Sequence, residues 1–186
     1  TGALAPAERL ATTQAPTYVW GEDINGDALP DLLAPGVDQI GLLQSDADLF
    51  GAPLALPAEG IEGVWGGDVD RDGNTDLAFV NRDSDTLSVQ RGLGGGVFAE
   101  AQTFQVGPSP VAVWGGDVDR DGNVDLIVAN SGSPGDTTGS ISFLAGQAQG
   151  SLADPVTFST DTGPASVWAD DDFNGDGFRD IAVATP

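Results

Sequence analysis

The chain has 186 residues and contains no cysteine, histidine, lysine or methionine. The absence of cysteine, histidine and lysine removes the side chains that supply most catalytic bases and nucleophiles. The scattered acids, such as Asp83, Asp85 and Asp161, form no recognisable catalytic pair. We therefore expect a protein that is not an enzyme.

Positive charge is also scarce, with six arginines against 29 acidic residues and a net charge of −23. Such a surface repels nucleic acid and anionic membranes, so neither is expected as a partner. No basic segment followed by a short apolar run indicates a signal peptide, and no long apolar run indicates a membrane span. A length of 186 residues suits one domain or one array of repeats.

One acidic loop of nine residues occurs four times, at 23–31, 68–76, 117–125 and 172–180. Each copy places oxygen-bearing side chains at loop positions 1, 3, 5 and 9. These side chains are Asp23, Asn25, Asp27 and Asp31; Asp68, Asp70, Asp72 and Asp76; Asp117, Asp119, Asp121 and Asp125; and Asp172, Asn174, Asp176 and Asp180. Hard divalent cations bind six to eight oxygens, several of them carboxylate, on a tight turn. The loops therefore predict about four Ca²⁺ ions, one per repeat.

Three alternatives to this kind of calcium loop fit the sequence less well. An EF-hand closes with a glutamate at position 12 between two helices, whereas position 12 is Phe79 in the second loop and Val128 in the third. A halophilic protein would scatter its acids, whereas fourteen of the 29 acids lie at these ligand positions. Metal-free Asp/Gly turns are the remaining alternative, but crowded carboxylates without a cation would repel one another.

The repeats extend beyond the loops and predict β-structure. A tryptophan precedes each loop, and a β-type run follows it, as in Leu77–Val80 and Leu126–Ala129. Third strands with alternating residues follow, and the 27 glycines and 12 prolines punctuate short strands. Four short strands in each unit of about 45–50 residues are typical of a β-propeller blade. The repeated tryptophans favour packing between blades over a ligand-stacking platform.

We predict an all-β fold, a β-propeller of about four four-stranded blades or part of a larger propeller. The predicted domain is a single repeat domain, 1–186, with blades at approximately 17–57, 61–106, 110–159 and 164–186, the last completed by 1–15. The last blade is split between the two ends because residues 8–20 align with 102–114, and it lacks a third strand. Three alternatives stay open: a piece of a longer propeller, closure by residues 1–5, or strand addition from another chain.

The acidic loop inside a four-stranded repeat resembles the FG-GAP/VCBS repeats of integrin-α-type propellers. The resemblance implies that the loop joins the first two strands of a blade and binds Ca²⁺, with a backbone carbonyl at position 7 as a further ligand. The implied carbonyls are those of Leu29, Asn74, Asn123 and Phe178. The first loop departs from the pattern by having Ala28 in place of glycine, and the first and fourth loops have asparagine at position 3. We expect weaker calcium sites in these two loops.

The sequence predicts a calcium-stabilised extracellular module, secreted or on the cell surface, because such loops match the millimolar calcium available outside cells. The module would act as a non-enzymatic, adhesion-type binding or structural unit that contacts a protein or glycan ligand at the propeller rim. The alternative is a self-assembling extracellular filament or surface-layer subunit, completed by strand addition from a neighbouring copy. Size-exclusion chromatography and electron microscopy with calcium would distinguish a monomer from a polymer.

Overall fold

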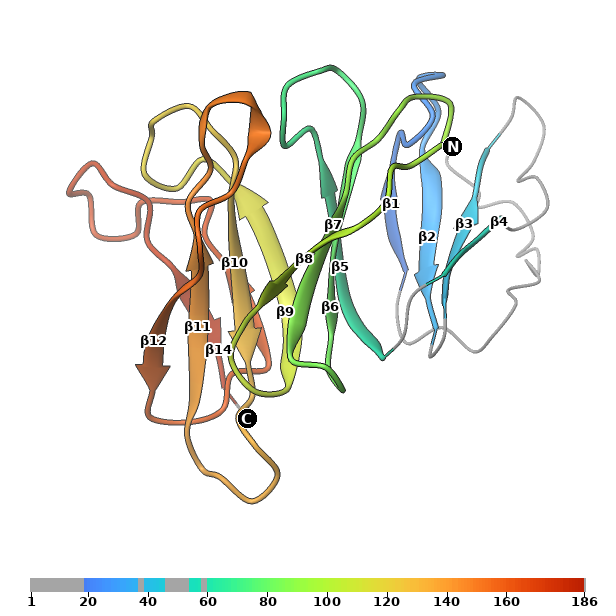
Figure 1. Cartoon of the computed structure of the whole chain (residues 1–186). Helices are drawn as coiled ribbons and strands as arrows, with labels where there is room; N and C mark the ends of the chain where they lie inside the picture. Colours follow the sequence, from blue (N-terminus) through green and yellow to red (C-terminus); the bar gives the residue numbers. More distant parts are fainter. Residues whose placement is uncertain (1–18, 37–38, 46–53, 58–59, 186) are drawn as a thin grey trace, which may run out of the picture.

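The computed structural model describes residues 19–36, 39–45, 54–57 and 60–185 (Figure 1). These residues form fourteen β-strands and one short 3-10 turn at Ala148–Gly150 (η1). None of the helical structure among them is long and apolar enough to cross a membrane. The prediction of an all-β fold is confirmed.

The strands form three four-stranded sheets and one two-stranded sheet, in chain order. The first sheet comprises β1 (Trp20–Glu22), β2 (Asp31–Pro35), β3 (Gln39–Leu43) and β4 (Leu54–Pro57). The second comprises β5 (Ile61–Gly67), β6 (Asp76–Asn81), β7 (Thr86–Gln90) and β8 (Gln102–Gln105). The third comprises β9 (Pro110–Gly116), β10 (Asp125–Asn130), β11 (Gly139–Leu144) and β12 (Val156–Thr160). The fourth comprises β13 (Ser166–Trp168) and β14 (Ala182–Ala184).

Each sheet is an antiparallel meander in which every strand pairs with the next one along the chain. The register repeats between sheets: Trp65 pairs with Ala78 in the second, and Trp114 with Ile127 in the third. The sheets stand side by side in a row, and the first strands β5, β9 and β13 contact one another in succession. The arrangement is that of a β-propeller, but the propeller is not closed (Figure 1).

Apolar residues fill the spaces between consecutive sheets. Strands β6 and β10 are buried along their whole length, because each lies in the middle of a sheet that is packed on both faces. Three clusters result, which include Leu33, Val64 and Leu77; Val80, Leu87 and Leu126; and Ile127, Val167 and Ala169. Burial of apolar surface contributes about 25 cal/mol per Å², so these clusters hold the sheets in their row.

The tryptophans of the first strands pack against the following sheet. A Cβ atom added to Gly66 would lie 2.4 Å from the ring of Trp20, and one added to Gly115 would lie 2.7 Å from the ring of Trp65. Glycine is therefore required at the point where each tryptophan ring lies against the first strand of the following sheet. The predicted packing between blades is confirmed for these two tryptophans.

The fourth sheet has only β13 and β14 among the described residues. The segment predicted to complete it, 1–15, lies outside the described residues, as do parts of the predicted first blade, 17–57.

Candidate metal centres

The four acidic loops each join the first and second strands of a sheet. They lie between β1 and β2, β5 and β6, β9 and β10, and β13 and β14. Because the sheets run in the same direction, the loops share one end of the row (Figure 1). This end is the candidate rim for binding.

Side-chain oxygens fold each loop around itself. In the second loop, Asp68 accepts hydrogen bonds from the backbone N–H groups of Asp72 (3.0 Å) and Gly73 (2.9 Å). Asp72 in turn accepts the N–H of Asn74 at 2.8 Å. In the other loops the backbone N–H groups of positions 6 and 7 donate in the same way. For example, Gly122 donates to Asp117 at 3.0 Å, and Phe178 donates to Asp176 at 2.9 Å. These hydrogen bonds lie within each loop, so the turn itself orients the carboxylates of positions 1 and 5.

Loop positions 4 and 6 have left-handed backbone in all four copies. Position 4 is Gly26, Arg71, Arg120 and Gly175, and position 6 is Ala28, Gly73, Gly122 and Gly177. Ala28 adopts a φ of 68° despite its Cβ atom. A non-glycine residue in this region costs about 1–2 kcal/mol, so each of the first three loops carries this cost once, at Ala28, Arg71 or Arg120, and the fourth loop avoids it.

The aspartate at position 9 ties the loop to its sheet. Asp76 is fully buried; its Oδ2 accepts the N–H of Val69 at 2.9 Å, and its Oδ1 accepts that of Gly92 at 2.7 Å. Asp125 is held identically by Val118 (2.9 Å) and Gly146 (2.7 Å). Asp31 is also fully buried and accepts the N–H groups of Ile24 and Ser45. In the first three loops position 9 is thus a structural tie between the loop and the end of the third strand, whereas Asp180 of the fourth loop accepts the N–H groups of Phe173 and Asn174 within its own loop.

Burial raises the pKa of the Asp76 and Asp125 carboxyls. The hydrogen bonds that these carboxyls accept from backbone N–H groups lower the pKa and so oppose the shift. Hydrogen bonds from Asn123 lower the pKa of exposed Asp121, and the charge of Arg71 contributes to the same direction. The hydrogen bond from Gly177 lowers the pKa of Asp172, with a contribution from the charge of Arg120.

Two loops bring three acidic side chains together. In the second loop, carboxylate oxygens of Asp68, Asp70 and Asp76 lie within 4.8 Å of one another. In the third loop, Asp117, Asp119 and Asp121 do so. In the first and fourth loops the position-3 amide is used internally, since Asn25 donates to Asp27 (3.0 Å) and Asn174 to Asp180 (3.1 Å).

One oxygen of the third loop has no partner among the described residues. Oδ1 of Asp117 is buried and accepts no hydrogen bond. A buried carboxylate oxygen without a partner is costly, and a cation within the loop would satisfy it. The donor set of the third loop is all oxygen, which suits Ca²⁺. The residues present therefore fit this ion, while the carbonyls of Leu29, Asn74, Asn123 and Phe178 stay predicted ligands.

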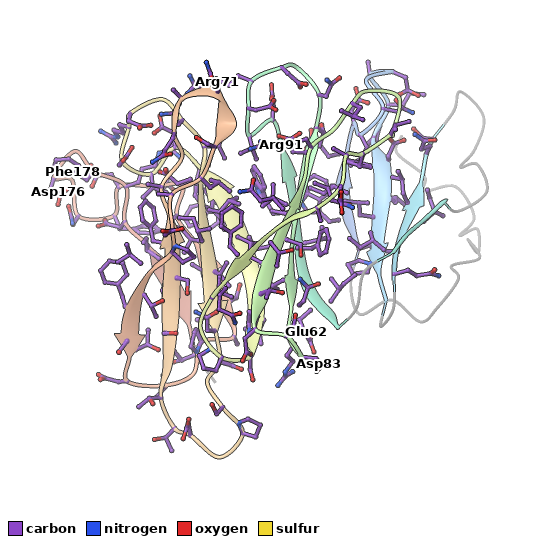
Figure 2. All side chains as sticks on the ribbon, in the orientation of Figure 1. Glu62, Arg71, Asp83, Arg91, Asp176 and Phe178 are labelled. Carbon is purple, nitrogen blue, oxygen red and sulfur yellow. The ribbon has the colours of Figure 1, made fainter. Side chains whose placement is uncertain are left out.

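An arginine enters the acidic cluster of the second loop. Nη1 of Arg91 lies 3.0 Å from Oδ2 of Asp76, and its Nε lies 3.9 Å from Oδ2 of Asp70. The same guanidinium donates to the carbonyl of Gly150 in η1 of the third sheet. Figure 2 shows Arg91 in the interior of the loop-bearing end, between neighbouring sheets. The third loop has Ala145 at the equivalent place, before the glycine that holds position 9.

Sequence reasoning missed Arg91 and the glycines that hold position 9. Gly92 and Gly146 follow the third strands, and a Cβ atom on either would lie 2.3 Å from a backbone carbonyl oxygen. The signal was available, since both follow a strand of the same repeat and precede a glycine-containing turn. The contact of Arg91 with the loop had no signal in the repeat pattern, because the residue occurs in one copy only.

A cavity of about 290 Å³ lies between the first strands of the second, third and fourth sheets. It is lined by Glu62, Gly63, Val64, Val111, Ala112, Val113, Ser166 and Val167. The acidic group in this lining, Glu62, already pairs with Arg82 at 3.1 Å. Apart from Glu62 and Ser166, the lining residues have no polar side chain.

Residues 68–128 match the family model of an FG-GAP-like repeat. The match begins at the second acidic loop and ends in β10, just after the third loop. The resemblance predicted from the sequence is confirmed, and the chain contains an FG-GAP-like repeat. No curated protein matches the chain.

Three solved structures are similar in fold. The Photorhabdus luminescens Tc holotoxin pore has a TM-score of 0.51 and 21% identity, over 90% of this chain and 8% of that one. BBS1N, solved in complex with ARL6DN, has a TM-score of 0.53 and 16% identity, over 82% of this chain and 46% of that one. An Agrocybe aegerita lectin specific for non-reducing terminal N-acetylglucosamine has a TM-score of 0.54 and 18% identity, over 90% of this chain and 46% of that one.

The chain spans less than half the length of each of these structures. At such identities the similarity defines the fold alone. It places this row of sheets in the β-propeller class.

Proposed function

We propose that this chain is a calcium-stabilised extracellular module with a non-enzymatic binding or structural role of the adhesion type. The observation that carries the proposal is the third loop, where three carboxylates lie within 4.8 Å and a buried oxygen of Asp117 has no partner among the described residues. A divalent cation relieves both the repulsion and the unsatisfied oxygen.

The loop side chains at positions 1, 3 and 5 would hold the ion. The position-9 aspartate would join them in loops where it lies in the acidic cluster, as Asp76 does. Bound Ca²⁺ supplies positive charge that offsets the mutual repulsion of the carboxylates. The chain's own contribution is orientation: backbone N–H groups fix each carboxylate before any ion arrives, as Gly73 does for Asp68. The buried position-9 aspartates of the second and third loops then couple these loops to the ends of the third strands of their sheets.

Three considerations support the remainder of the proposal. Two proteins of similar fold are a lectin that recognises N-acetylglucosamine and a protein solved in complex with a protein partner. A protein or glycan ligand at the loop-bearing rim is the corresponding proposal for this chain. The lack of histidine, cysteine and lysine favours binding over catalysis, and millimolar calcium outside cells favours an extracellular site of action.

Thermal unfolding after removal of calcium tests the proposal. The melting temperature should fall in EGTA and recover with excess Ca²⁺ but less with Mg²⁺, which binds reluctantly to all-protein oxygen cages. An ion that binds only the native state stabilises it by about 2.7 kcal/mol per site at a hundredfold excess over Kd. An unchanged melting temperature in EGTA would remove the calcium proposal. A glycan array and a pull-down with surface proteins then test the ligand class.

A further inference from the structure

Positive charge is scarce in this chain, yet position 4 is an arginine in two of the acidic loops. These residues are Arg71 of the second loop and Arg120 of the third, whereas the first and fourth loops have Gly26 and Gly175. Both arginines have left-handed backbone, with φ of 63° and 62°, a conformation that glycine adopts without steric cost. The turn itself therefore favours glycine at this position, and the arginine side chain contributes something other than loop geometry.

The guanidinium of Arg71 leaves its own loop and lies over the third loop. A Cβ atom added to Gly122, at position 6 of the third loop, would lie 3.3 Å from Nη2 of Arg71. A Cβ atom added to Gly73 or Gly177, the same position in the second and fourth loops, would meet no described atom within 4 Å. Figure 2 shows Arg71 at the end of the row that carries the loops. The contact therefore joins two consecutive acidic loops, which belong to neighbouring sheets.

The charge of each arginine acts on a carboxylate of the next loop. Hydrogen bonds from the position-7 asparagine are the main reason that the pKa of Asp121 is lowered, and the charge of Arg71 adds to them. A hydrogen bond from a loop glycine is the main reason that the pKa of Asp172 is lowered, and the charge of Arg120 adds to it. Both arginines thus act from one loop on the next loop along the chain.

Neither arginine is held by an ion pair. Among the described residues, the ion pairs within 4 Å are those of Arg82, Arg91 and Arg179. Arg71 and Arg120 are both exposed. An exposed guanidinium beside an acidic loop contributes little to folding, but it places a positive charge near the site that a cation would enter. A role in ion affinity fits this arrangement better than a structural role.

We propose that Arg71 and Arg120 each belong to one acidic loop and weaken calcium binding in the next loop along the chain. The inference rests on the proposed calcium binding, and it makes the affinity of a loop depend partly on the preceding repeat. Arg71 has the larger effect, because no described atom lies within 4 Å of a Cβ atom added to Gly177 in the fourth loop. Its effect is smaller than that of Arg91, which forms an ion pair inside the second loop.

The size of the effect follows from Coulomb's law. A unit positive charge about 8 Å from a divalent ion in water weakens binding of the ion by roughly fivefold. Physiological salt reduces this to about twofold, because the screening length is then similar to the separation. We therefore expect a change of about two- to fivefold in affinity when the charge is removed.

Calcium titrations followed by proton–nitrogen correlation NMR separate the loops. The N–H of position 6 donates to the aspartate at position 1, so the amides of Gly73, Gly122 and Gly177 each report on one loop. Arg71→Gln should tighten calcium binding at the third loop by about two- to fivefold. Arg120→Gln should tighten binding at the fourth loop by less. If each arginine acted on its own loop instead, Arg120→Gln and not Arg71→Gln would tighten the third site, and the proposal would be wrong.

Two further measurements distinguish charge from structure. Arg71→Lys keeps the charge and should bind calcium as the wild type does. In about 1 M KCl the difference between Arg71→Gln and the wild type should disappear, because the screening length is then about 3 Å, whereas a structural effect would persist. Arg71→Gly, which introduces the residue found at this position in the first and fourth loops, replaces Arg71→Gln if that variant fails to fold.

Arg82→Gln is the matched control for the loss of one positive charge. Arg82 pairs with Glu62, which lies at the opposite end of the sheets from Arg71 (Figure 2). The control should leave the affinities of all three reporting loops unchanged. Wild-type loops that bind no calcium would remove both this inference and the proposed function. Calcium binding with an unchanged third site in Arg71→Gln would remove this inference alone.

Discussion

The second and third acidic loops have nearly the same sequence but neutralise their carboxylates differently. In the second, the guanidinium of Arg91 contacts Asp76 at 3.0 Å and approaches Asp70 at 3.9 Å. In the third, Ala145 stands at the equivalent place and Oδ1 of Asp117 is buried without a partner among the described residues. In the second loop an arginine therefore supplies positive charge inside the cluster, and in the third loop we propose that an ion does so.

This difference separates two sites that the sequence alone groups together. Four carboxylates at positions 1, 3, 5 and 9 predict that both loops bind calcium more tightly than the first and fourth. Arg91 reduces the net negative charge of the second cluster and competes for its oxygens. We therefore expect the third loop to be the tightest site and to depend most on calcium.

The largest expected effect follows from removing the buried tie in the second loop. Asp76→Ala leaves the N–H groups of Val69 and Gly92 without their acceptor and Arg91 without its ion pair. Each buried group left unsatisfied costs about 1–3 kcal/mol. The free energy of unfolding should therefore fall several times more than it does for a substitution at an exposed residue. Urea unfolding with and without calcium measures it. Asp125→Ala is the comparison and should cost less, and equal losses would show that Arg91 contributes nothing.

The next effect is loss of the third metal site. Asp121→Ala removes one of the three clustered carboxylates, and the calcium-induced stabilisation should fall by about 2.7 kcal/mol at a hundredfold excess of calcium over Kd. Asp72→Ala removes the same position of the second loop and should reduce the calcium effect less. Melting temperatures of both variants, in calcium and in EGTA, provide the measurement. A greater loss from Asp72→Ala would reverse the proposed order of the two sites.

Arg91→Gln removes the guanidinium from the second loop, so that this loop, like the third, has no arginine in its acidic cluster. Without calcium it should lower the free energy of unfolding by about 1.5–3 kcal/mol, because hydrogen bonds to charged groups contribute that much. With calcium the loss should shrink, because the ion replaces the missing charge. Arg82→Gln is the control, since Arg82 forms a partly exposed pair with Glu62 that is worth about 0–1 kcal/mol. A calcium-independent loss in Arg91→Gln would contradict the competition between arginine and ion.

The smallest expected effect concerns the first loop. Asn25→Asp adds a fourth carboxylate and removes the amide that donates to Asp27. Calorimetry should show tighter calcium binding at this loop, by up to about tenfold or 1.4 kcal/mol. Four equal sites in the wild-type protein would argue against the ranking on which this change is based.

Much of the fold was predictable because each element has a local signal. The tryptophan strand, the acidic loop and the following β-run recur in every repeat, and strands β6 and β10 occur where such runs were predicted. The packing role of Trp20 and Trp65 also followed from repetition. These features depend on residue spacing alone, which a sequence displays directly.

Other features depend on contacts between distant residues and could not be predicted. Arg91 reaches an aspartate fifteen residues earlier and a carbonyl of the next sheet, Gly150. The ties of position 9, in which Asp76 and Asp125 use both oxygens to accept backbone N–H groups, had no such signal, and these aspartates stay predicted metal ligands. A repeat pattern identifies which residues are equivalent, but not which neighbour satisfies each oxygen.

Anomalous diffraction from crystals grown in millimolar calcium tests the central claim most directly. The account predicts anomalous density inside the acidic loops, strongest in the third loop within bonding distance of Asp117, Asp119 and Asp121. Density in the second loop should be weaker and should increase in Arg91→Gln. A third loop without anomalous density, in a protein that is folded at that calcium concentration, would contradict the account.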